Sequence, residues 1–203
     1  MNNKNLTTFY IIRHGETDWN VERKIQGHTD IPLNANGELQ AQSLAKELQK
    51  ISFDLVFSSD LLRAKRTAEI IALERKVEVQ TTRLLRERNF GNMEGEPSRL
   101  FRDYDELLKE LSHEQRFTHK LADNIENDEA LISRILTFVR ETAVTHPNKT
   151  ILMVTHGGVI RTLLIHLGAY KYNDTFHIGN GAYVKITADG TDFFVKQTKG
   201  IER

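Results

Sequence analysis

Cysteine is absent from the 203 residues, so the chain can form no disulfide, no thiolate metal site and no cysteine nucleophile. A net positive charge is missing too, because 28 lysines and arginines are balanced by 28 aspartates and glutamates. This balance excludes the global basic field that draws proteins to nucleic acid. Any nucleophile must therefore come from another residue type, and an anionic substrate must be held by cations gathered locally.

Long apolar runs are also lacking. No segment approaches the roughly 18 apolar residues of a membrane span, and residues 1–15 lack the basic, apolar and small-residue pattern of a signal peptide. We therefore expect a cytoplasmic protein with no membrane partner. With 39% hydrophobic residues, the chain suits one globular domain over residues 1–203.

Short apolar runs alternate with segments of helical periodicity. Strands are predicted at 8–12, 54–58, 77–80 and 150–155, helices at 35–50, 61–73, 128–145 and 158–167, and a hairpin at 182–198. Asn34 is suited to cap the first of these helices. This alternation predicts an α/β fold, a three-layer α/β/α sandwich with a mostly parallel central sheet. The charged stretch 92–130 carries apolar residues at helical spacing and is predicted to be a small helical cap insertion.

The dipeptide His-Gly follows two of the predicted strands, at His14-Gly15 and at His156-Gly157. Ligands bind beyond the carboxyl ends of parallel strands. Each glycine lets a ligand approach the backbone closely, and the helix that begins after Gly157 offers free N–H groups that favour an anion. A phosphate group fits this description.

Two arginines are expected at the same edge of the sheet. Arg13 precedes the first histidine and closes an apolar strand, where a charged side chain needs a partner, and Arg63 lies just after the second strand. Guanidinium groups match phosphate oxygens bidentately. Taken alone, Arg63 reads as a surface residue beside Lys65 and Arg66. With Arg13 and the histidines, it reads as part of a phosphate site.

Five segments in order span most of the chain: RHGETDWN at 13–20, IQGHTDIPLNANGELQA at 25–41, SSDLLRAKRTAE at 58–69, LRERNFGNMEGE at 85–96 and VTHGGVIRTLL at 154–164. Together they resemble the histidine phosphatase superfamily, the phosphoglycerate-mutase-like proteins. The resemblance implies that His14 is the nucleophile and Glu87 the proton donor. It also implies that the phosphoryl group is held by Arg13, Arg63 and His156, with supporting contacts from Asn20, Gln26 and Gly27.

These implied roles agree with elementary chemistry. A neutral imidazole attacks phosphorus at neutral pH and forms a phosphohistidine. Arg13, Arg63 and a protonated or donating His156 would stabilise the charge on the transferred group, so no metal and no cofactor is required. Glu87 would donate a proton to the departing alcohol and then accept one from water. The expected partner is a small-molecule phosphate monoester; a salt bridge within RLLRER is the other interpretation of Glu87.

The sequence departs from the mutase pattern at several positions. Gly158 stands where mutases place Asn, Phe90 where the family has Tyr, and 92–130 contains no basic, proline-rich substrate segment. The carboxylate of a phosphoglycerate then lacks evident partners. We therefore predict a phosphomonoester hydrolase, with a cofactor-dependent phosphoglycerate mutase as the alternative. A Gly-Glu-Ser-like signature found in many relatives is also absent, and Glu129 is the residue that could replace its glutamate.

Two further alternatives belong to other classes. His14, His156 and Glu87 could form a facial triad for iron, but two arginines beside a divalent cation would be electrostatically unfavourable. Metal content of the purified protein separates these hypotheses. A non-catalytic phosphate-binding module would be expected to lose His14 or Glu87, and the chain keeps both. The sequence leaves the substrate and the oligomeric state open, and a homo-oligomer is among the states it permits.

Overall fold

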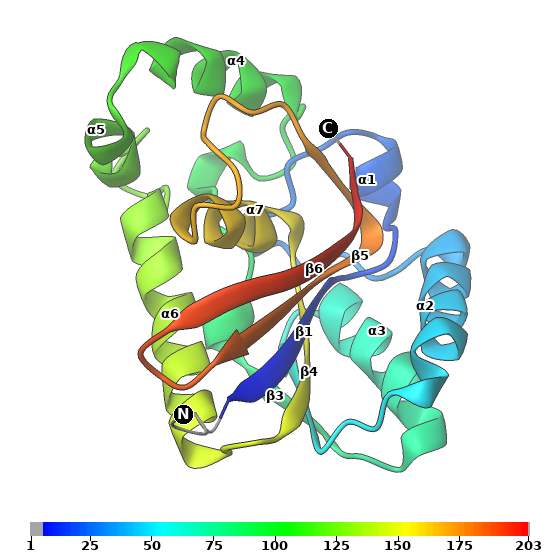
Figure 1. Ribbon diagram of the computed structural model, residues 1–203. Helices are drawn as coiled ribbons and strands as arrows, with labels where there is room; N and C mark the ends of the chain where they lie inside the picture. The colour runs from blue at the N-terminus through cyan, green and yellow to red at the C-terminus, as the bar shows by residue number, and fades with distance from the viewer. Residues whose placement is uncertain (1–5, 203) are drawn as a thin grey trace.

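A computed structural model describes residues 6–202, which form a six-stranded sheet with helices on both faces (Figure 1). The strands are β1 (Thr7–Arg13), β2 (Leu55–Ser59), β3 (Val79–Thr82), β4 (Thr150–Thr155), β5 (His177–Ala188) and β6 (Phe193–Glu202). Their order across the sheet is β3-β2-β4-β1-β5-β6. The first four in this order are parallel, and β5 and β6 add an antiparallel hairpin. Residues 1–5, part of the segment expected to lack a signal peptide, lie outside the described residues.

Apart from α1, the helices occur where the periodicity predicted them. They are α1 (Asp18–Val21), α2 (Ala35–Glu47), α3 (Leu62–Ala72), α4 (Arg99–Leu107), α5 (His113–Thr118), α6 (Asp128–Thr145) and α7 (Gly157–His166). Short 3₁₀ turns are η1 (Leu48–Lys50), η2 (Leu73–Arg75), η3 (Arg83–Leu85), η4 (Gly91–Met93) and η5 (Leu108–Glu110). Within residues 6–202, no helix combines the length and the apolar character needed to cross a bilayer.

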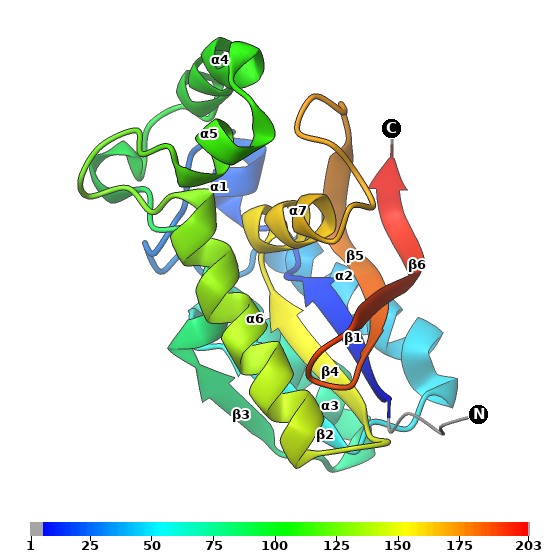
Figure 2. The same ribbon diagram turned by 60° about the vertical axis from the view of Figure 1, so that its left-hand side comes forward.

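The layers follow from the two-residue period of the central strands. In β1, Phe9 and Ile11 join the core beneath α6 and α7, whereas Tyr10 and Ile12 join the core beneath α2 and α3. The side chains of β4 alternate in the same way. Figures 1 and 2 show the two helix pairs on opposite faces of the sheet. The predicted α/β/α sandwich is confirmed.

One helix was not predicted, and one strand begins earlier than predicted. Thr17 and Asn20 form a reciprocal capping box that starts α1 inside a segment expected to be loop. The strand β5 begins at His177, five residues before the predicted start at 182. The pairing of β5 with β6 is irregular between Ile178 and Tyr183, and the glycines in this stretch weaken the strand signal.

The stretch 92–130 supplies the predicted helical cap, although its last residues belong to α6. We call residues 97–127 the cap segment. It carries α4 and α5 above the carboxyl ends of the parallel strands (Figure 1). The rings of Phe90 and Phe101 meet edge to face, with centroids 5.0 Å apart, and the Arg116 guanidinium lies 4.6 Å from the Tyr172 ring centroid. These contacts hold the cap segment against the sheet domain.

Candidate active site

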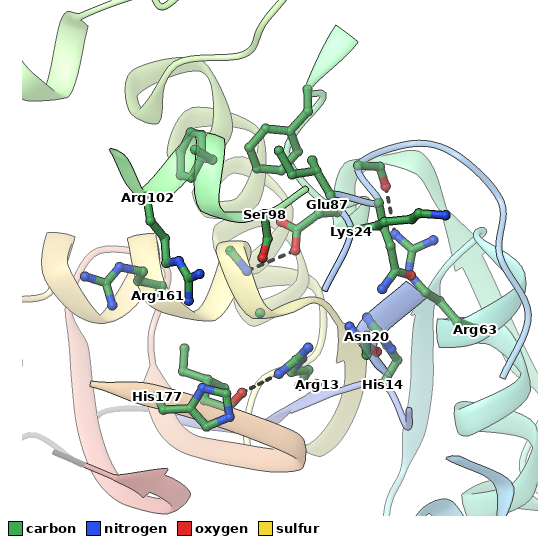
Figure 3. A pocket seen from close by; sticks show the side chains of 18 of the residues that line it. Arg13, His14, Asn20, Lys24, Arg63, Glu87, Ser98, Arg102, Arg161 and His177 are labelled. Carbon is green, nitrogen blue, oxygen red and sulfur yellow. Dashed lines mark hydrogen bonds between the residues drawn. The ribbon is translucent and has the colours of Figure 1, made fainter. Parts of the chain in front are cut away.

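A cavity of about 320 Å³ lies at the carboxyl ends of β1 and β4, beneath the cap segment (Figure 3). Eight of the nine candidate residues line it: Arg13, His14, Asn20, Gln26, Gly27, Arg63, Glu87 and Gly157. The ninth, His156, is fully buried, and its ring centroid is 5.1 Å from that of His14. The two His-Gly dipeptides meet because β1 and β4 are neighbours in parallel register, with Arg13 opposite Thr155.

One hydrogen bond orients His14. Its Nδ1 atom lies 2.7 Å from the carbonyl oxygen of Gly15. Because a carbonyl can only accept, Nδ1 carries the proton and Nε2 keeps its lone pair. Burial, with Arg63 and Arg13 nearby, lowers the pKa of His14 well below the ordinary value of 6.5. The imidazole is therefore neutral and nucleophilic at neutral pH.

His156 differs from the expectation of a protonated group. Burial and the neighbouring Arg63 lower the pKa of His156 well below 6.5, so the ring is neutral. Neither ring nitrogen has a hydrogen-bond partner among the described residues. A buried polar ring without a partner is costly unless a ligand supplies one. The prediction also allowed His156 to act as a hydrogen-bond donor, and a neutral imidazole can still donate through one ring N–H.

Both predicted arginines reach the cavity and are held by backbone carbonyls. Arg63 is fully buried and donates to the carbonyl oxygens of Gly27 at 2.7 Å and Thr29 at 2.9 Å. Burial lowers the pKa of Arg63 to about 10, which leaves it charged at neutral pH. Arg13 donates to the carbonyl oxygen of Ile178, and its Nε has no partner within residues 6–202. Unused donors on both side chains are available to phosphate oxygens.

The carboxylate of Glu87 is clamped at the start of α7. Its Oε2 accepts from the N–H of Gly158 at 3.0 Å, and its Oε1 accepts from the N–H of Arg88 at 2.8 Å. The carbonyl oxygen of Glu87 accepts from Arg134 and contacts His28 Nε2, each at 2.9 Å. No ion pair of Glu87 within RLLRER is found in the described part of the chain. Glu87 faces the cavity instead (Figure 3).

Residues 9–199 match the histidine phosphatase superfamily (branch 1). The chain belongs to this superfamily. It is 37% identical over 162 residues to the uncharacterized phosphatase PhoE of Bacillus subtilis (strain 168), covering 80% of this chain and 78% of that protein.

A second relative and a solved structure extend the comparison. Phosphoglycerate mutase-like protein 4 of Arabidopsis thaliana is 45% identical over 161 residues, which are 75% of this chain and 67% of that one. The solved structure of YhfR from Bacillus stearothermophilus superposes with a TM-score of 0.80 and 31% identity, over 96% of each chain. Both phosphatases and mutase-like proteins are thus among the relatives of this histidine phosphatase superfamily member.

Glu94 is a structural residue that sequence reasoning missed in this histidine phosphatase fold. Its carboxylate accepts from the N–H groups of His28 and Thr29, each at 2.8 Å, and from the Thr29 hydroxyl at 2.7 Å. These bonds shape the loop whose carbonyls hold Arg63. Gly27 has a φ of +53°, and a Cβ there would lie 2.1 Å from Glu94 Oε1, so only glycine fits. The position of Glu94 in MEGE gave no signal of this contact.

Several basic residues of the cavity were also missed: Lys24, Arg102, Arg161 and His177. Arg161 had a signal, because it follows Gly157 by four residues and therefore lies on the same face of α7. Arg102 had none, since α4 carries Arg99 and Arg102 alike. The stretch 92–130 thus brings one cation, Arg102, to the cavity, although it contains no basic, proline-rich segment.

Acidic residues do not assemble a metal site here. Among residues 6–202, no three His, Cys, Asp or Glu side chains are grouped closely enough to hold a metal ion. The side chains of His14, His156 and Glu87 thus do not form the iron triad considered above. Glu129 is exposed on the first turn of α6 and is not among the residues that line the cavity.

The two buried histidines should make stability fall in acid. In the unfolded chain these histidines have the ordinary pKa of about 6.5, but in the folded chain their pKa values are lower. The free energy of unfolding therefore falls as the pH drops below 6.5 toward the folded pKa values. As the pH falls from 7.5 to 5.5, each histidine should lower the free energy of unfolding by up to about 1.4 kcal/mol. Urea unfolding at both pH values tests this. His14→Gln should reduce the difference in the free energy of unfolding between the two pH values by up to the contribution of one histidine, whereas the exposed-residue control His119→Gln should leave it unchanged. An equal difference in both variants would contradict the lowered pKa of His14.

Proposed function

We propose that the chain hydrolyses small phosphate monoesters through a phosphohistidine on His14. The observation that carries the proposal is the bond from Nδ1 of His14 to the Gly15 carbonyl, which leaves Nε2 free beside Arg13 and the buried Arg63. Membership in a superfamily that includes proteins named as phosphatases supports the same reaction.

In the first step, the Nε2 lone pair forms a bond to phosphorus as the bond from phosphorus to the ester oxygen breaks. Arg13 and Arg63 bind the equatorial oxygens, on which charge accumulates. His156 donates one ring N–H, which gives the buried imidazole the partner it otherwise lacks. The departing alkoxide takes a proton from Glu87.

The second step returns the proton that Glu87 donates in the first. After the alcohol leaves, the carboxylate accepts a proton from water while that water attacks phosphorus. The bond from phosphorus to Nε2 then breaks, and inorganic phosphate and free His14 result.

No metal is needed in this scheme. The guanidinium groups of Arg13 and Arg63 supply the positive charge that a divalent cation supplies in other phosphoryl-transfer enzymes. The N-terminus of α7 adds the N–H group of Gly157, a residue that lines the cavity. The metal-independent mechanism therefore rests on donors that the chain itself contributes.

Hydrolysis is favoured over mutase activity by Gly158. A Cβ at this position would lie 2.4 Å from Glu87 Oε1. The Asn that mutases place there would push the carboxylate out of its present position at the start of α7. The chain thus positions Glu87 differently from the mutase pattern, which supports transfer to water.

We expect phosphate release to exceed interconversion of phosphoglycerates. The purified protein would be given 2- or 3-phosphoglycerate with catalytic bisphosphoglycerate, and both the isomer ratio and free phosphate would be followed. A chelator should leave the rate unchanged, because the charge comes from arginines. Faster interconversion than release would identify a mutase instead, and loss of activity on chelation with recovery on adding metal would contradict the metal-independent mechanism.

A further inference from the structure

Glu87 lies in a segment of the chain that has no regular secondary structure. Residues 86–90 belong to neither a helix nor a strand, so no ladder of backbone hydrogen bonds fixes their shape. A general acid must nevertheless meet the departing oxygen at hydrogen-bond distance. Because misplacing a reacting group by about 1 Å can lower a rate about 100-fold, this segment needs support from other parts of the chain.

The contacts of the Glu87 carboxylate cannot provide this support throughout the reaction. Its two oxygens accept the N–H groups of Arg88 and Gly158, as an ionised carboxylate does. A protonated carboxyl oxygen that donates to a leaving group accepts less well, so one of these bonds weakens when Glu87 acts as an acid. The backbone carbonyl of Glu87 accepts hydrogen bonds equally in both protonation states.

Arg134 binds that carbonyl. Its Nη2 donates to the carbonyl oxygen of Glu87 at 2.9 Å, and its Nη1 donates to the carbonyl oxygen of Leu84 at 2.7 Å. The planar guanidinium thus bridges two carbonyls and fixes the path of the chain between them. Arg134 is not among the residues that line the cavity. It can therefore affect the reaction only through the residues that it holds.

Glu126 fixes the orientation of Arg134. Its two carboxylate oxygens accept from Nε of Arg134 at 2.8 Å and from Nη2 at 3.0 Å, which makes a bidentate ion pair between two largely buried side chains. Glu126 also binds the other end of the acid segment. Its Oε2 accepts from the N–H of Asn89 at 3.2 Å, and its own N–H donates to the carbonyl oxygen of Asn89 at 2.9 Å. The ion pair thus holds the chain on both sides of Glu87.

The helix that carries Arg134 is firmly packed. α6 runs from the end of the cap segment along one face of the sheet (Figures 1 and 2). Leu131 and Ile135 bury this helix in the core beneath α6 and α7. Asn127 caps its first turn by accepting from the N–H of Ala130 at 3.0 Å. Contacts with Arg134 therefore tie the acid segment to the core.

A second side chain supports the same carbonyl from another loop. Nε2 of His28 lies 2.9 Å from the carbonyl oxygen of Glu87, and it donates because a carbonyl can only accept. The backbone of His28 is held independently, since its N–H donates to Oε1 of Glu94 at 2.8 Å. Like Arg134, His28 is not among the cavity residues. Two donors from distant parts of the chain thus converge on one backbone oxygen.

We propose that Arg134 is a positioning residue for proton transfer from Glu87 to the leaving oxygen. Glu126 orients its guanidinium, and His28 is the second donor to the carbonyl of Glu87. The inference rests on the proposed phosphatase function, in which Glu87 is the general acid. It assigns to a side chain outside the cavity an effect on one chemical step, beyond its contribution to stability.

Leaving groups test this inference. Phosphorylation of the enzyme would be followed in single turnovers with p-nitrophenyl phosphate, whose leaving group needs no proton, and with 3-phosphoglycerate and glycerol 3-phosphate, whose alcohols do. Arg134→Met should slow phosphorylation by the alkyl esters about tenfold to 100-fold, the scale of a misplaced catalytic group, and phosphorylation by the aryl ester much less. Arg134→Lys should restore part of the loss, because an ammonium group can donate to a carbonyl but lacks the planar fork.

Arg140→Met is the matched control. Arg140 lies on the same helix, is exposed, and stacks on the ring of Phe193 with its guanidinium 5.5 Å from the ring centroid. It is not among the residues that line the cavity. The control variant should keep the wild-type rate of phosphorylation with both types of ester.

A double variant distinguishes positioning from a general structural defect. In a Glu87→Gln background the acid is already gone, so adding Arg134→Met should cause little further loss with the alkyl esters. A defect that does not act through Glu87 would instead multiply the two losses. His28→Ala serves if Arg134→Met fails to fold because Glu126 is left unpaired. It removes one donor to the same carbonyl and should give a smaller loss, again mainly with the alkyl esters.

Four results would overturn the inference. These are equal slowing of alkyl and aryl esters by Arg134→Met, or by His28→Ala if the first variant does not fold; multiplied losses in the double variant; an equal loss in the Arg140→Met control; and phosphorylation of the wild-type protein by the aryl ester alone. A wild-type phosphoenzyme on His14 leaves the proposed function standing in each case. Absence of phosphoenzyme with all three esters would instead overturn the proposed function and this inference with it.

Discussion

Replacing His14 by alanine should abolish the covalent intermediate and lower kcat by at least about 10⁴-fold, the scale of losing a catalytic nucleophile. The reason lies in the tautomer. The Gly15 carbonyl fixes the proton on Nδ1, and burial together with Arg63 and Arg13 keeps the ring neutral, so Nε2 is a ready nucleophile. Alanine offers no lone pair, and Arg13 and Arg63 alone can only position the ester.

The measurement is a brief reaction with phosphoryl-labelled substrate followed by an alkaline quench. A phosphohistidine survives alkali and is lost in acid, which separates it from an acyl phosphate or a serine phosphate. Wild-type protein and the exposed-residue control His119→Ala should both carry the label, and His14→Ala should carry none. Label retained by His14→Ala, or undiminished turnover, would show that the nucleophile lies elsewhere.

The fold could be predicted from the sequence because its strands are short, apolar and bounded by clear turn signals. The run TILMVT becomes β4, and its alternate side chains serve two separate cores. Asn34 caps α2 as expected, its side chain accepting from the N–H of Gly37 at 2.8 Å. The early start of β5 was missed because irregular pairing and glycines interrupt the strand pattern there.

The close approach of His14 and His156 could be predicted for a related reason. His14 and His156 follow strands that are parallel neighbours, so the position of each at a strand end brings them together. The presence of Arg102 in the cavity could not be predicted, because Arg102 reaches the cavity only through the packing of the cap segment. A helix with several arginines gives no sequence signal for which of them faces a ligand.

Glu87→Gln should distinguish substrates by their leaving groups. An alkyl alcohol leaves poorly without a proton, so phosphorylation of the enzyme by alkyl monoesters should slow by about 10²-fold to 10⁴-fold, the usual contribution of a general acid. p-Nitrophenolate is stable near neutral pH and needs no proton. Phosphorylation by p-nitrophenyl phosphate should therefore slow much less.

The structure makes the comparison of leaving groups necessary. Both carboxylate oxygens of Glu87 accept backbone N–H groups, from Gly158 and Arg88. A glutamine replaces one acceptor by a donor, so Glu87→Gln also loses one of these hydrogen bonds and shifts the side chain. A positional defect of this kind slows both substrate types, and a missing proton slows only the alkyl esters. Glu129→Gln removes an exposed carboxylate away from the cavity and should change neither rate.

The phosphorylation step must be measured by itself, by rapid quench in a single turnover. In the proposed mechanism Glu87 also accepts the proton of the attacking water in the second step, which is the same for every ester. Steady-state turnover limited by that step would slow equally for all substrates and hide the difference. Equal slowing of the phosphorylation step by alkyl and aryl esters would mean that Glu87 positions the phosphoryl group rather than protonating the leaving oxygen. The proton would then have to come from another residue, and the buried His156, with both ring nitrogens unpartnered among the described residues, would be the next to test.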